Sequence, residues 1–227
     1  MKKPQLTLFV AIMLCCLTKG FSQKGNYHIT NGISITGAIT KLDISTNNFT
    51  TKQGDGFLGA LTATVDIPHR WYNISFGMQL SESSIGIAAR PTLVSTNNTF
   101  IDYKLFAAQV AFLGHIKVIP DYVTIDLGPM LQYNSKLELK DASNETYYIN
   151  NYTDLTAKDI SNISQFNLNG AVGASLGVRN FKLKAQYIYG FTNILNKLET
   201  QNLDASGGSA RFKGNQNMLV LGAVISF

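Results

Sequence analysis

The chain has 227 residues, of which 45% are hydrophobic and 15% charged, and its formal net charge is +5. This length fits one domain of moderate size. Three lysines lie within the first 22 residues, so the remainder holds 16 basic and 14 acidic residues and gives no case for nucleic-acid binding.

Residues 1–22 have the pattern of a secretory signal peptide. Two lysines open the chain, ten apolar residues follow at 8–17, and small residues at positions 20 and 22 suit cleavage before Gln23. Ten residues cover about half of a bilayer as a helix, so we expect cleavage and a mature domain at 23–227. Both cysteines, Cys15 and Cys16, would leave with the signal, which excludes disulfides and cysteine catalysis in the mature domain.

The remaining chain alternates apolar and polar residues in eight segments. A period of two residues is typical of an extended strand with one apolar face. The sequence therefore predicts strands at 28–45, 56–67, 72–90, 100–118, 122–138, 163–179, 181–194 and 215–227.

The connections between these segments alternate in length. Short turns lie at 68–70, 120–121 and 180, whereas long polar connections lie at 46–55, 91–99, 139–162 and 195–214. Short periplasmic turns and long extracellular loops are typical of outer-membrane barrels. In hydrocarbon the sheet must have no free edge, so the last strand has to pair with the first. We expect an all-β fold: a closed, antiparallel, up-and-down, eight-stranded transmembrane β-barrel in the bacterial outer membrane.

The two faces of the predicted strands differ in side-chain size. Segment 181–192 carries large apolar residues on one face and lysine, glutamine, glycine and threonine on the other. An eight-stranded lumen is too narrow for the bulky face, so we expect that face to meet lipid and small polar residues to fill the interior. Segments 57–67 and 105–116 are partly apolar on both faces. The alternative is a soluble β-sandwich or lipocalin-like barrel with the apolar face inward.

Aromatic residues mark both the strand starts and the end of the chain. Trp71, Tyr72, Tyr122 and Phe181 begin strands at the short-turn end, where a periplasmic aromatic girdle is expected. The last strand places apolar residues at every second position and ends at Phe227. This ending is expected of an outer-membrane barrel and predicts recognition by the barrel-assembly machinery.

Several charged residues fall near the short-turn ends and point into the lumen by parity. Because a buried charge is costly without a partner, we expect Asp66 and Asp126 to pair with Arg179 and Lys182 in a network that fills the lower barrel. The alternative is a charge-lined conduit. The six charges concerned are Asp66, Lys117, Asp126, Arg179, Lys182 and Lys184.

No catalytic, cofactor-binding or metal-binding residues are predicted, and we do not expect an enzyme. A lipid-active barrel enzyme needs a nucleophile and a histidine base at the extracellular rim. None of the histidines fits that pattern: His28 starts a strand, His69 lies in a turn, and His115 lies near a periplasmic strand end. The nearest approach to a metal set is a turn and loop group of Asp55, Asp141 and Glu145.

The long connection 140–162 offers a candidate contact surface. It carries Tyr147, Tyr148, Ile149 and Tyr152 among polar residues. Exposed aromatic residues on such a loop would suit contact with a protein or a glycan. The alternative is that the strands extend past the membrane and the loop caps them.

Three segments resemble one family. Residues 127–133 (LGPMLQY), 185–194 (AQYIYGFTNI) and the closing strand after Gly214 are similar to the PorT-like outer-membrane β-barrel family of Bacteroidetes. The chain departs from that family at Gln186, where the family usually has arginine. The resemblance implies a small outer-membrane barrel, and a few relatives resemble secretion-assembly factors.

These observations together predict a monomeric outer-membrane barrel without cofactor. Its lumen is expected to be filled by side chains and its role to be structural or interactive, in surface binding or secretion assembly, with lipid around the wall. The alternative function is a small-solute channel or transporter.

Overall fold

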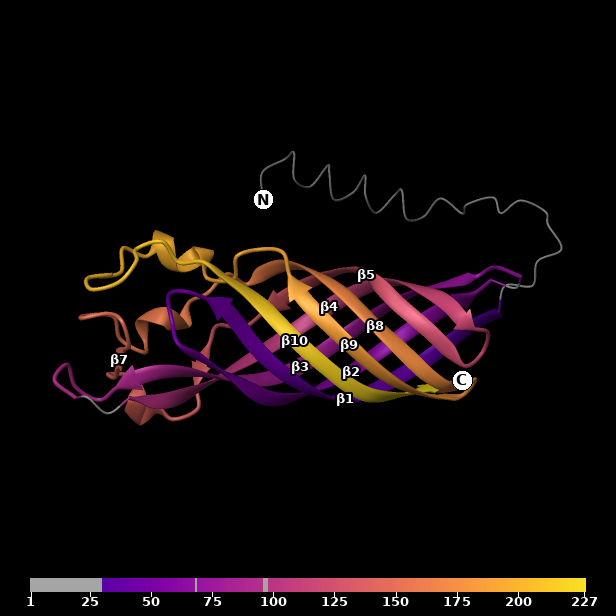
Figure 1. The fold of residues 1–227 in the computed structure, drawn as a ribbon, viewed down its shortest axis with the longest axis horizontal. Helices are drawn as coiled ribbons and strands as arrows, with labels where there is room; N and C mark the ends of the chain where they lie inside the picture. The colour runs from indigo at the N-terminus through magenta and orange to yellow at the C-terminus, as the bar shows by residue number, and fades with distance from the viewer. Residues whose placement is uncertain (1–29, 68, 96–97) are drawn as a thin grey trace, which may run out of the picture.

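The structure is a computed structural model that describes residues 30–67, 69–95 and 98–227. The predicted signal peptide at 1–22 and His28 lie outside these residues. The described chain forms one antiparallel sheet of ten strands with three short 3-10 helices, η1 (Ala142–Asn144), η2 (Asp159–Ser161) and η3 (Asn196–Thr200) (Figure 1). No helix within these ranges is long and apolar enough to cross a membrane.

Eight long strands form the wall of the fold. In chain order they are β1 (Thr30–Thr46), β2 (Thr51–Asp66), β3 (Tyr72–Arg90), β4 (Thr99–Ile119), β5 (Val123–Asn134), β8 (Phe166–Val178), β9 (Phe181–Gly190) and β10 (Gly214–Ser226). Two further strands, β6 (Glu138–Leu139) and β7 (Tyr148–Ile149), extend the ladders of β4 and β3 at the long-loop end.

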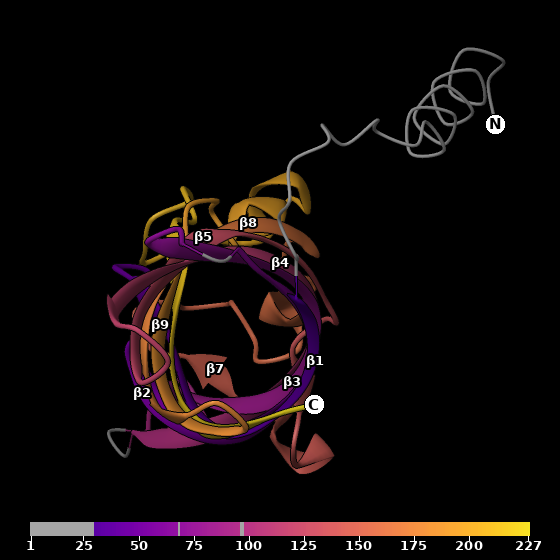
Figure 2. The same ribbon diagram turned by 90° about the vertical axis from the view of Figure 1, so that its right-hand side faces the viewer.

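The eight long strands close into a ring. Each pairs antiparallel with the next, and β10 pairs with β1 from Thr46↔Gly214 to Ser34↔Ser226. Figure 2 views this ring end-on. Closure satisfies the backbone donors and acceptors of every long strand, as a hydrocarbon environment requires. The predicted pairing of the last strand with the first is confirmed.

The alternation of turn lengths is also confirmed, with one exception in the first loop. The structure begins β2 at Thr51, whereas the sequence predicts a loop as far as residue 55. The Gly54-Asp55-Gly56 sequence is a β-bulge within β2 and not a turn. A Cβ atom on Gly54 or Gly56 would overlap the β3 backbone at the carbonyl oxygens of Ser84 and Glu82, so glycine allows the two strands to approach this closely.

The outer surface of the ring carries a continuous apolar band, as predicted. Large side chains of alternate residues are exposed on all eight wall strands. A water-soluble domain of this size would not expose so many of them together, whereas lipid solvates them. Representative members, one or two from each of the eight strands, are Ile39, Leu61, Phe76, Phe112, Leu127, Leu131, Val172, Leu183 and Leu221.

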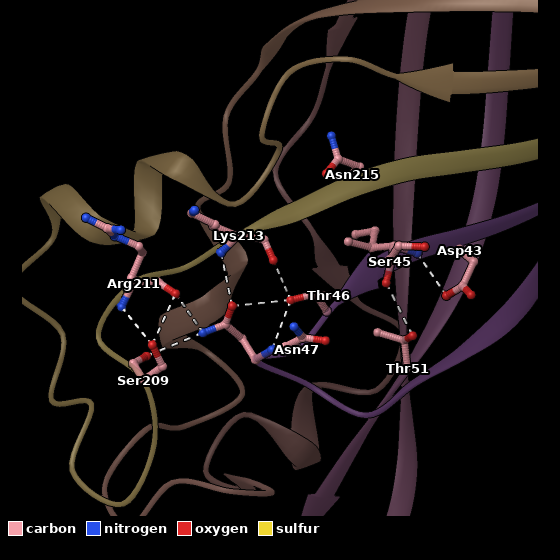
Figure 3. Close-up of a pocket in the computed structure, with 11 residues that line it drawn as sticks. Asp43, Ser45, Thr46, Asn47, Thr51, Ser209, Arg211, Lys213 and Asn215 are labelled. Carbon is pink, nitrogen blue, oxygen red and sulfur yellow. Dashed lines mark hydrogen bonds between the residues drawn. The ribbon is translucent and has the colours of Figure 1, made fainter.

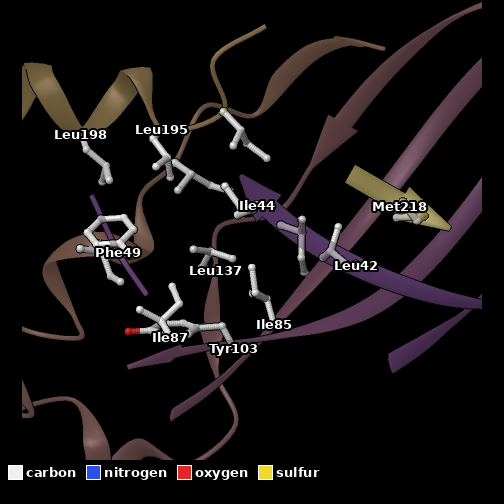
Figure 4. Close-up of a cluster of buried hydrophobic side chains, with 14 of the residues drawn as sticks. Leu42, Ile44, Phe49, Ile85, Ile87, Tyr103, Leu137, Leu195, Leu198 and Met218 are labelled. Atoms are coloured by element: carbon white, nitrogen blue, oxygen red, sulfur yellow. The ribbon is translucent and has the colours of Figure 1, made fainter. Parts of the chain in front are cut away.

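The interior has two zones, and only one of them was predicted. The periplasmic half holds small and polar residues, as predicted, together with a few apolar residues such as Leu113, which pairs with Ser75. The long-loop half is filled by large apolar side chains, so the prediction of a small, polar interior is wrong there. Figure 4 shows this apolar core between the wall strands and the folded loops, with Leu42, Ile44, Ile85, Ile87, Tyr103, Leu137 and Leu195 among its members.

This apolar core includes inward-facing residues of the two segments that are apolar on both faces, Leu58 of 57–67 and Leu105 of 105–116. The long-loop ends of β1, β3 and β4 lie beyond the lipid-facing band and pack inward on residues from the loops. Tyr103, for example, is fully buried, and its hydroxyl donates to the Ala157 carbonyl 2.9 Å away. At the long-loop end (the upper barrel), the fold therefore buries large apolar side chains, as a soluble protein does. In the periplasmic half (the lower barrel), it exposes them to lipid, as a membrane protein does.

A layer of amide side chains crosses the interior, and the apolar core continues on both sides of it: Met130 lies on the periplasmic side of Gln132 on β5 and is a member of this core. Gln132 lies at the centre of the amide layer: its oxygen accepts from Gln109 at 2.7 Å and from Asn169 at 2.8 Å. Its nitrogen donates to Gln216 at 2.7 Å. Because β5 and β10 are not neighbours in the sheet, the Gln132–Gln216 hydrogen bond crosses the lumen.

Candidate functional site

The segment 135–165 folds back as a cap at the long-loop end. The sequence predicts exposed aromatic residues here, and that prediction is wrong: Ile149 and Tyr152 are buried, and Tyr147 and Tyr148 are half-buried. β7 holds this segment to the end of β3 through the pair Ala89↔Ile149. The alternative reading, in which the strands extend past the membrane and the loop caps them, is the one observed.

Asn48 joins the cap to two other loops. This side chain is 4% exposed. Its amide nitrogen donates to the Tyr152 hydroxyl (3.0 Å) and to the Arg211 carbonyl (3.0 Å), and its oxygen accepts from the Lys213 amide (3.0 Å). Loops 47–50, 135–165 and 191–213 are therefore fixed to one another by a single buried amide.

An aromatic cluster supports this junction from below. Phe49, Tyr152 and Phe212 come from the three loops, and their ring centroids lie 6.0 to 6.1 Å apart. Each ring is buried. Aromatic contacts at this spacing add stability beyond the area they bury. The loops consequently form a packed layer with fixed backbone positions.

A polar pocket of about 680 Å³ opens above this layer. The side chains of Arg211 and Lys213 are exposed at its edge, on either side of the buried Phe212. Figure 3 shows these cations together with hydroxyl and amide groups from β1, β2 and β10. The lining residues are Asp43, Ile44, Ser45, Thr46, Asn47, Asn48, Thr51, Ser209, Arg211, Lys213 and Asn215.

A second polar cluster lies inside the periplasmic half of the lumen. Asp126 is fully buried and receives hydrogen bonds from Thr124 (2.8 Å) and Ser175 (2.6 Å). His115 contacts Asp126 through Nδ1 at 2.7 Å and Ser75 through Nε2 at 2.6 Å. We call these five residues, from β3, β4, β5 and β8, the lumen cluster.

Ser75, His115 and Asp126 have the order of a hydrolytic triad, but their surroundings do not suit catalysis. Ser75 is 2% exposed, so its hydroxyl offers almost no surface to a substrate. Both oxygens of Asp126 are engaged by hydroxyl groups as well as by the imidazole. The arrangement instead neutralises a buried carboxylate with many donors, which is the requirement for burying charge at low cost.

The predicted ion-pair network is correct in location and in Asp126, and wrong in its partners. Arg179 is exposed in a periplasmic turn, and the described ion pair of Asp126 is with His115. The cation that interacts with this carboxylate electrostatically is the half-buried Lys184, not Lys182. The side chain of Asp66 lies outside the described part of the structure.

The contacts of the lumen cluster could have been predicted from the sequence. A tight turn at 120–121 sets the β4–β5 register so that His115 lies opposite Asp126. The turn at 180 likewise places Lys184 opposite Ser175 in the β8–β9 pair. The turns are predicted correctly, but residues were not paired across the hairpins that these turns define. Pairing across both hairpins would have identified these partners.

The acidic residues nearest to a metal set are spread apart. Asp55 pairs with Lys41 at 2.6 Å, Glu145 pairs with Lys158 at 3.1 Å, and Asp141 accepts from the Ser143 amide at the start of η1. In the part of the chain that the structure describes, no three histidine, cysteine or acidic residues gather where they could hold a metal ion. The roles of these acids are local and structural.

Comparison with known proteins gives similarity in fold. No family model and no curated protein matches this chain. Among solved structures it is similar to the Neisserial surface protein A (14% identity, 88% of this chain, 99% of that chain, TM-score 0.46). It is also similar to the outer membrane protein OprG from Pseudomonas aeruginosa (11%, 88%, 97%, 0.47) and to Ail, the attachment invasion locus protein of Yersinia pestis (14%, 87%, 99%, 0.41).

These similarities concern the fold alone. The chain is an outer-membrane β-barrel protein, with a closed antiparallel ring and an apolar outer band that meets lipid. The resemblance to the PorT-like family has no counterpart among these matches and stays a prediction.

Proposed function

We propose that this chain is a sealed outer-membrane barrel that presents a rigid binding surface at the cell exterior. The observation that carries the proposal is the filled lumen. From the periplasmic end upward it holds the lumen cluster, the amide layer around Gln132, and the apolar core beneath the cap. A barrel that is filled along its length has its free surface for binding on the loops.

The small-solute channel is supported less well. The Gln132–Gln216 hydrogen bond crosses the lumen, and residues such as Leu137 and Tyr103 are buried directly above it. Eight strands enclose an interior just wide enough for side chains. A continuous aqueous path would require these layers to separate.

Conductance recording tests the sealed barrel. The purified chain, inserted into planar bilayers, should give no stable conductance steps above the bare-membrane baseline. Steps of nanosiemens size that scale with the amount of inserted protein would contradict the proposal and favour the channel. The measurement does not depend on knowing a ligand.

The expected partners follow from the same architecture. Lipid contacts the outer band, and the strand that ends at Phe227 supports recognition by the barrel-assembly machinery as the chain inserts. A role in secretion assembly is supported by the PorT-like segments 127–133 and 185–194. Deleting the gene and measuring secreted protein would test that role separately from surface binding.

A further inference from the structure

The pocket above the loop junction has a net positive charge, since two cations and one carboxylate line it. Four described lysines at the long-loop end have a carboxylate partner: Lys41, Lys104, Lys140 and Lys158. Within the described ranges, no such ion pair involves Arg211 or Lys213. Asp43, the one acid of the pocket lining, accepts the Ile44 amide at 2.8 Å. The pocket therefore presents two cations on a fixed polar frame.

The frame fixes the backbone of both cationic residues. The Lys213 amide donates to Asn48 (3.0 Å), and its carbonyl accepts from Thr46 (2.6 Å). The Arg211 carbonyl accepts from Asn48 at 3.0 Å. Phe212, between them, is buried in the aromatic cluster. Binding an anion would require ordering of the two side chains only, which lowers the entropic cost of association.

The pocket lies at the depth of lipid headgroups. At the long-loop end of β9, the exposed rings of Tyr189 and of Phe191, which directly follows the strand, form an edge-on pair with centroids 5.8 Å apart, as expected of an aromatic girdle at a membrane interface. The pocket residue Asn215 donates to the Gly190 carbonyl between them, at 2.8 Å. Since this is the long-loop end of the barrel, the pocket opens beside the outer leaflet.

The chemistry of the lining selects the headgroup. Arginine binds phosphate oxygens in a bidentate way, and lysine adds a point charge. Basic pockets at this depth bind anionic lipid headgroups. The hydroxyl groups of Ser45 and Thr51 and the carboxylate of Asp43 can exchange hydrogen bonds with sugar hydroxyls. No aromatic ring lines the pocket as described, so the stacking platform that a neutral sugar would need is missing.

We propose that this pocket binds the phosphorylated sugar headgroup of an outer-leaflet glycolipid, with Arg211 and Lys213 on the phosphate. The assignment rests on the proposed surface-binding function and names its ligand class. Lipid would then have two roles: it surrounds the apolar band without specificity, and it binds in this pocket as a specific ligand.

The test measures binding of fluorescent bisphosphorylated lipid A to the full chain in zwitterionic detergent micelles. Wild type is compared with the double variant Arg211→Gln/Lys213→Gln. The control Lys136→Gln/Arg179→Gln also removes one arginine and one lysine, both exposed and outside the pocket. We expect the pocket variant to lose about 10-fold or more in affinity and the control to match wild type.

Three further probes separate the sources of the phosphate. Dephosphorylated lipid A should bind at least about 10-fold more weakly than the phosphorylated form, since charge-assisted contacts are lost. Inorganic phosphate and glucosamine 1-phosphate should compete weakly. Equal affinity of the pocket variant and wild type, or of the two lipid forms, would overturn the proposal. Glucosamine 1-phosphate binding as tightly as lipid A would overturn the lipid assignment in favour of a soluble ligand.

These outcomes are distinguishable from failure of the proposed function. If the barrel gives no conductance steps and binds the two lipid forms equally, the proposed ligand is wrong and the proposal of a sealed barrel is retained. A conducting barrel would overturn the sealed barrel whatever its affinity for lipid.

Discussion

At the scale of single residues, Asp126 shows how a membrane barrel tolerates charge in its lumen. The carboxylate has no exposed surface, yet it has an imidazole, two hydroxyls and a nearby lysine around it. Removing one member of a buried charged group leaves the others unsatisfied. The cost of such a change exceeds what the intact group contributes to stability.

The variant Asp126→Ala should therefore lower the free energy of unfolding by about 3–5 kcal/mol, because His115 and Lys184 lose their buried counter-charge. Urea unfolding in detergent, followed by the fluorescence of Trp71, the single tryptophan, measures this loss. Asp55→Ala is the matched control, since its ion pair with Lys41 is exposed and should not contribute measurably. A loss no larger than that of the control would contradict the role given to Asp126.

Tyr152 carries the corresponding role in the cap. Its hydroxyl accepts from Asn48 and donates to the Ser209 carbonyl at 3.0 Å, so Tyr152→Phe leaves both groups without this partner. We expect a loss of about 1–2 kcal/mol at neutral pH. Tyr187→Phe, on the lipid-facing band, should have little effect.

The Tyr152 variant should also change the response to alkaline pH. Burial raises the pKa of the Tyr152 phenol, and the hydrogen bond from Asn48 offsets part of this rise. A group with a raised folded-state pKa stabilises the fold fully below its unfolded value and loses this contribution as pH rises through the raised value. The difference in Tm between wild type and Tyr152→Phe should shrink above about pH 10. A difference that stays constant from pH 8 to 11 would argue against a buried, hydrogen-bonded phenol.

At the scale of elements, close approach of strands fixes the positions of several glycines. A Cβ atom on Gly128 would overlap the Phe112 carbonyl oxygen and lie 3.0 Å from the Leu113 Cα. Gly59, on β2, has no atom within 4 Å of the same point. Gly128 lies within the 127–133 segment that resembles the PorT-like family, so part of that resemblance reflects a steric requirement of the β4–β5 pair.

Gly128→Ala should accordingly destabilise the barrel by about 1–3 kcal/mol through overpacking, and Gly59→Ala should be tolerated. The fraction of chain that migrates as the compact, unheated form on a denaturing gel reports folding of both variants. Equal folded fractions would show that the β4–β5 backbones can separate without cost.

The sequence predicted the wall of the barrel closely and its contents poorly. Alternation and turn residues gave eight strands, the closing pair and the outward face, because lipid imposes a period of two on every strand. The same alternation cannot tell an apolar core from an apolar exterior. Beyond the lipid band, residues such as Leu42 and Ile85 turn a large apolar face inward, and only the folded loops reveal what they pack on.

The candidate pocket could not be predicted from sequence patterns, because its residues come from segments that are far apart in the chain. Its residues come from β1, β2, β10 and the 191–213 segment, and it is assembled by Asn48, an asparagine among many in polar loops. No local spacing marks that residue. The lumen cluster, by contrast, follows from hairpin register and could have been predicted from the turns at 120–121 and 180.

At the scale of the whole molecule, the fold joins two kinds of solvent environment in one ring. The lower barrel faces lipid outward and buries polar groups, whereas the upper barrel faces water and buries an apolar core. The amide layer around Gln132 lies between the lumen cluster and the core beneath the cap. The central claim is that the bulky faces of the lower strands meet lipid and the polar faces are enclosed.

The most direct test places a fluorophore at single cysteines and quenches it with spin-labelled lipid in nanodiscs. With Cys15 and Cys16 replaced by serine, the chain has no other thiol, so Leu183→Cys and Gln186→Cys can each be labelled alone. We expect strong quenching at position 183, which faces outward, and little at position 186, which is buried in the lumen. Quenching at 186 with protection at 183 would contradict it.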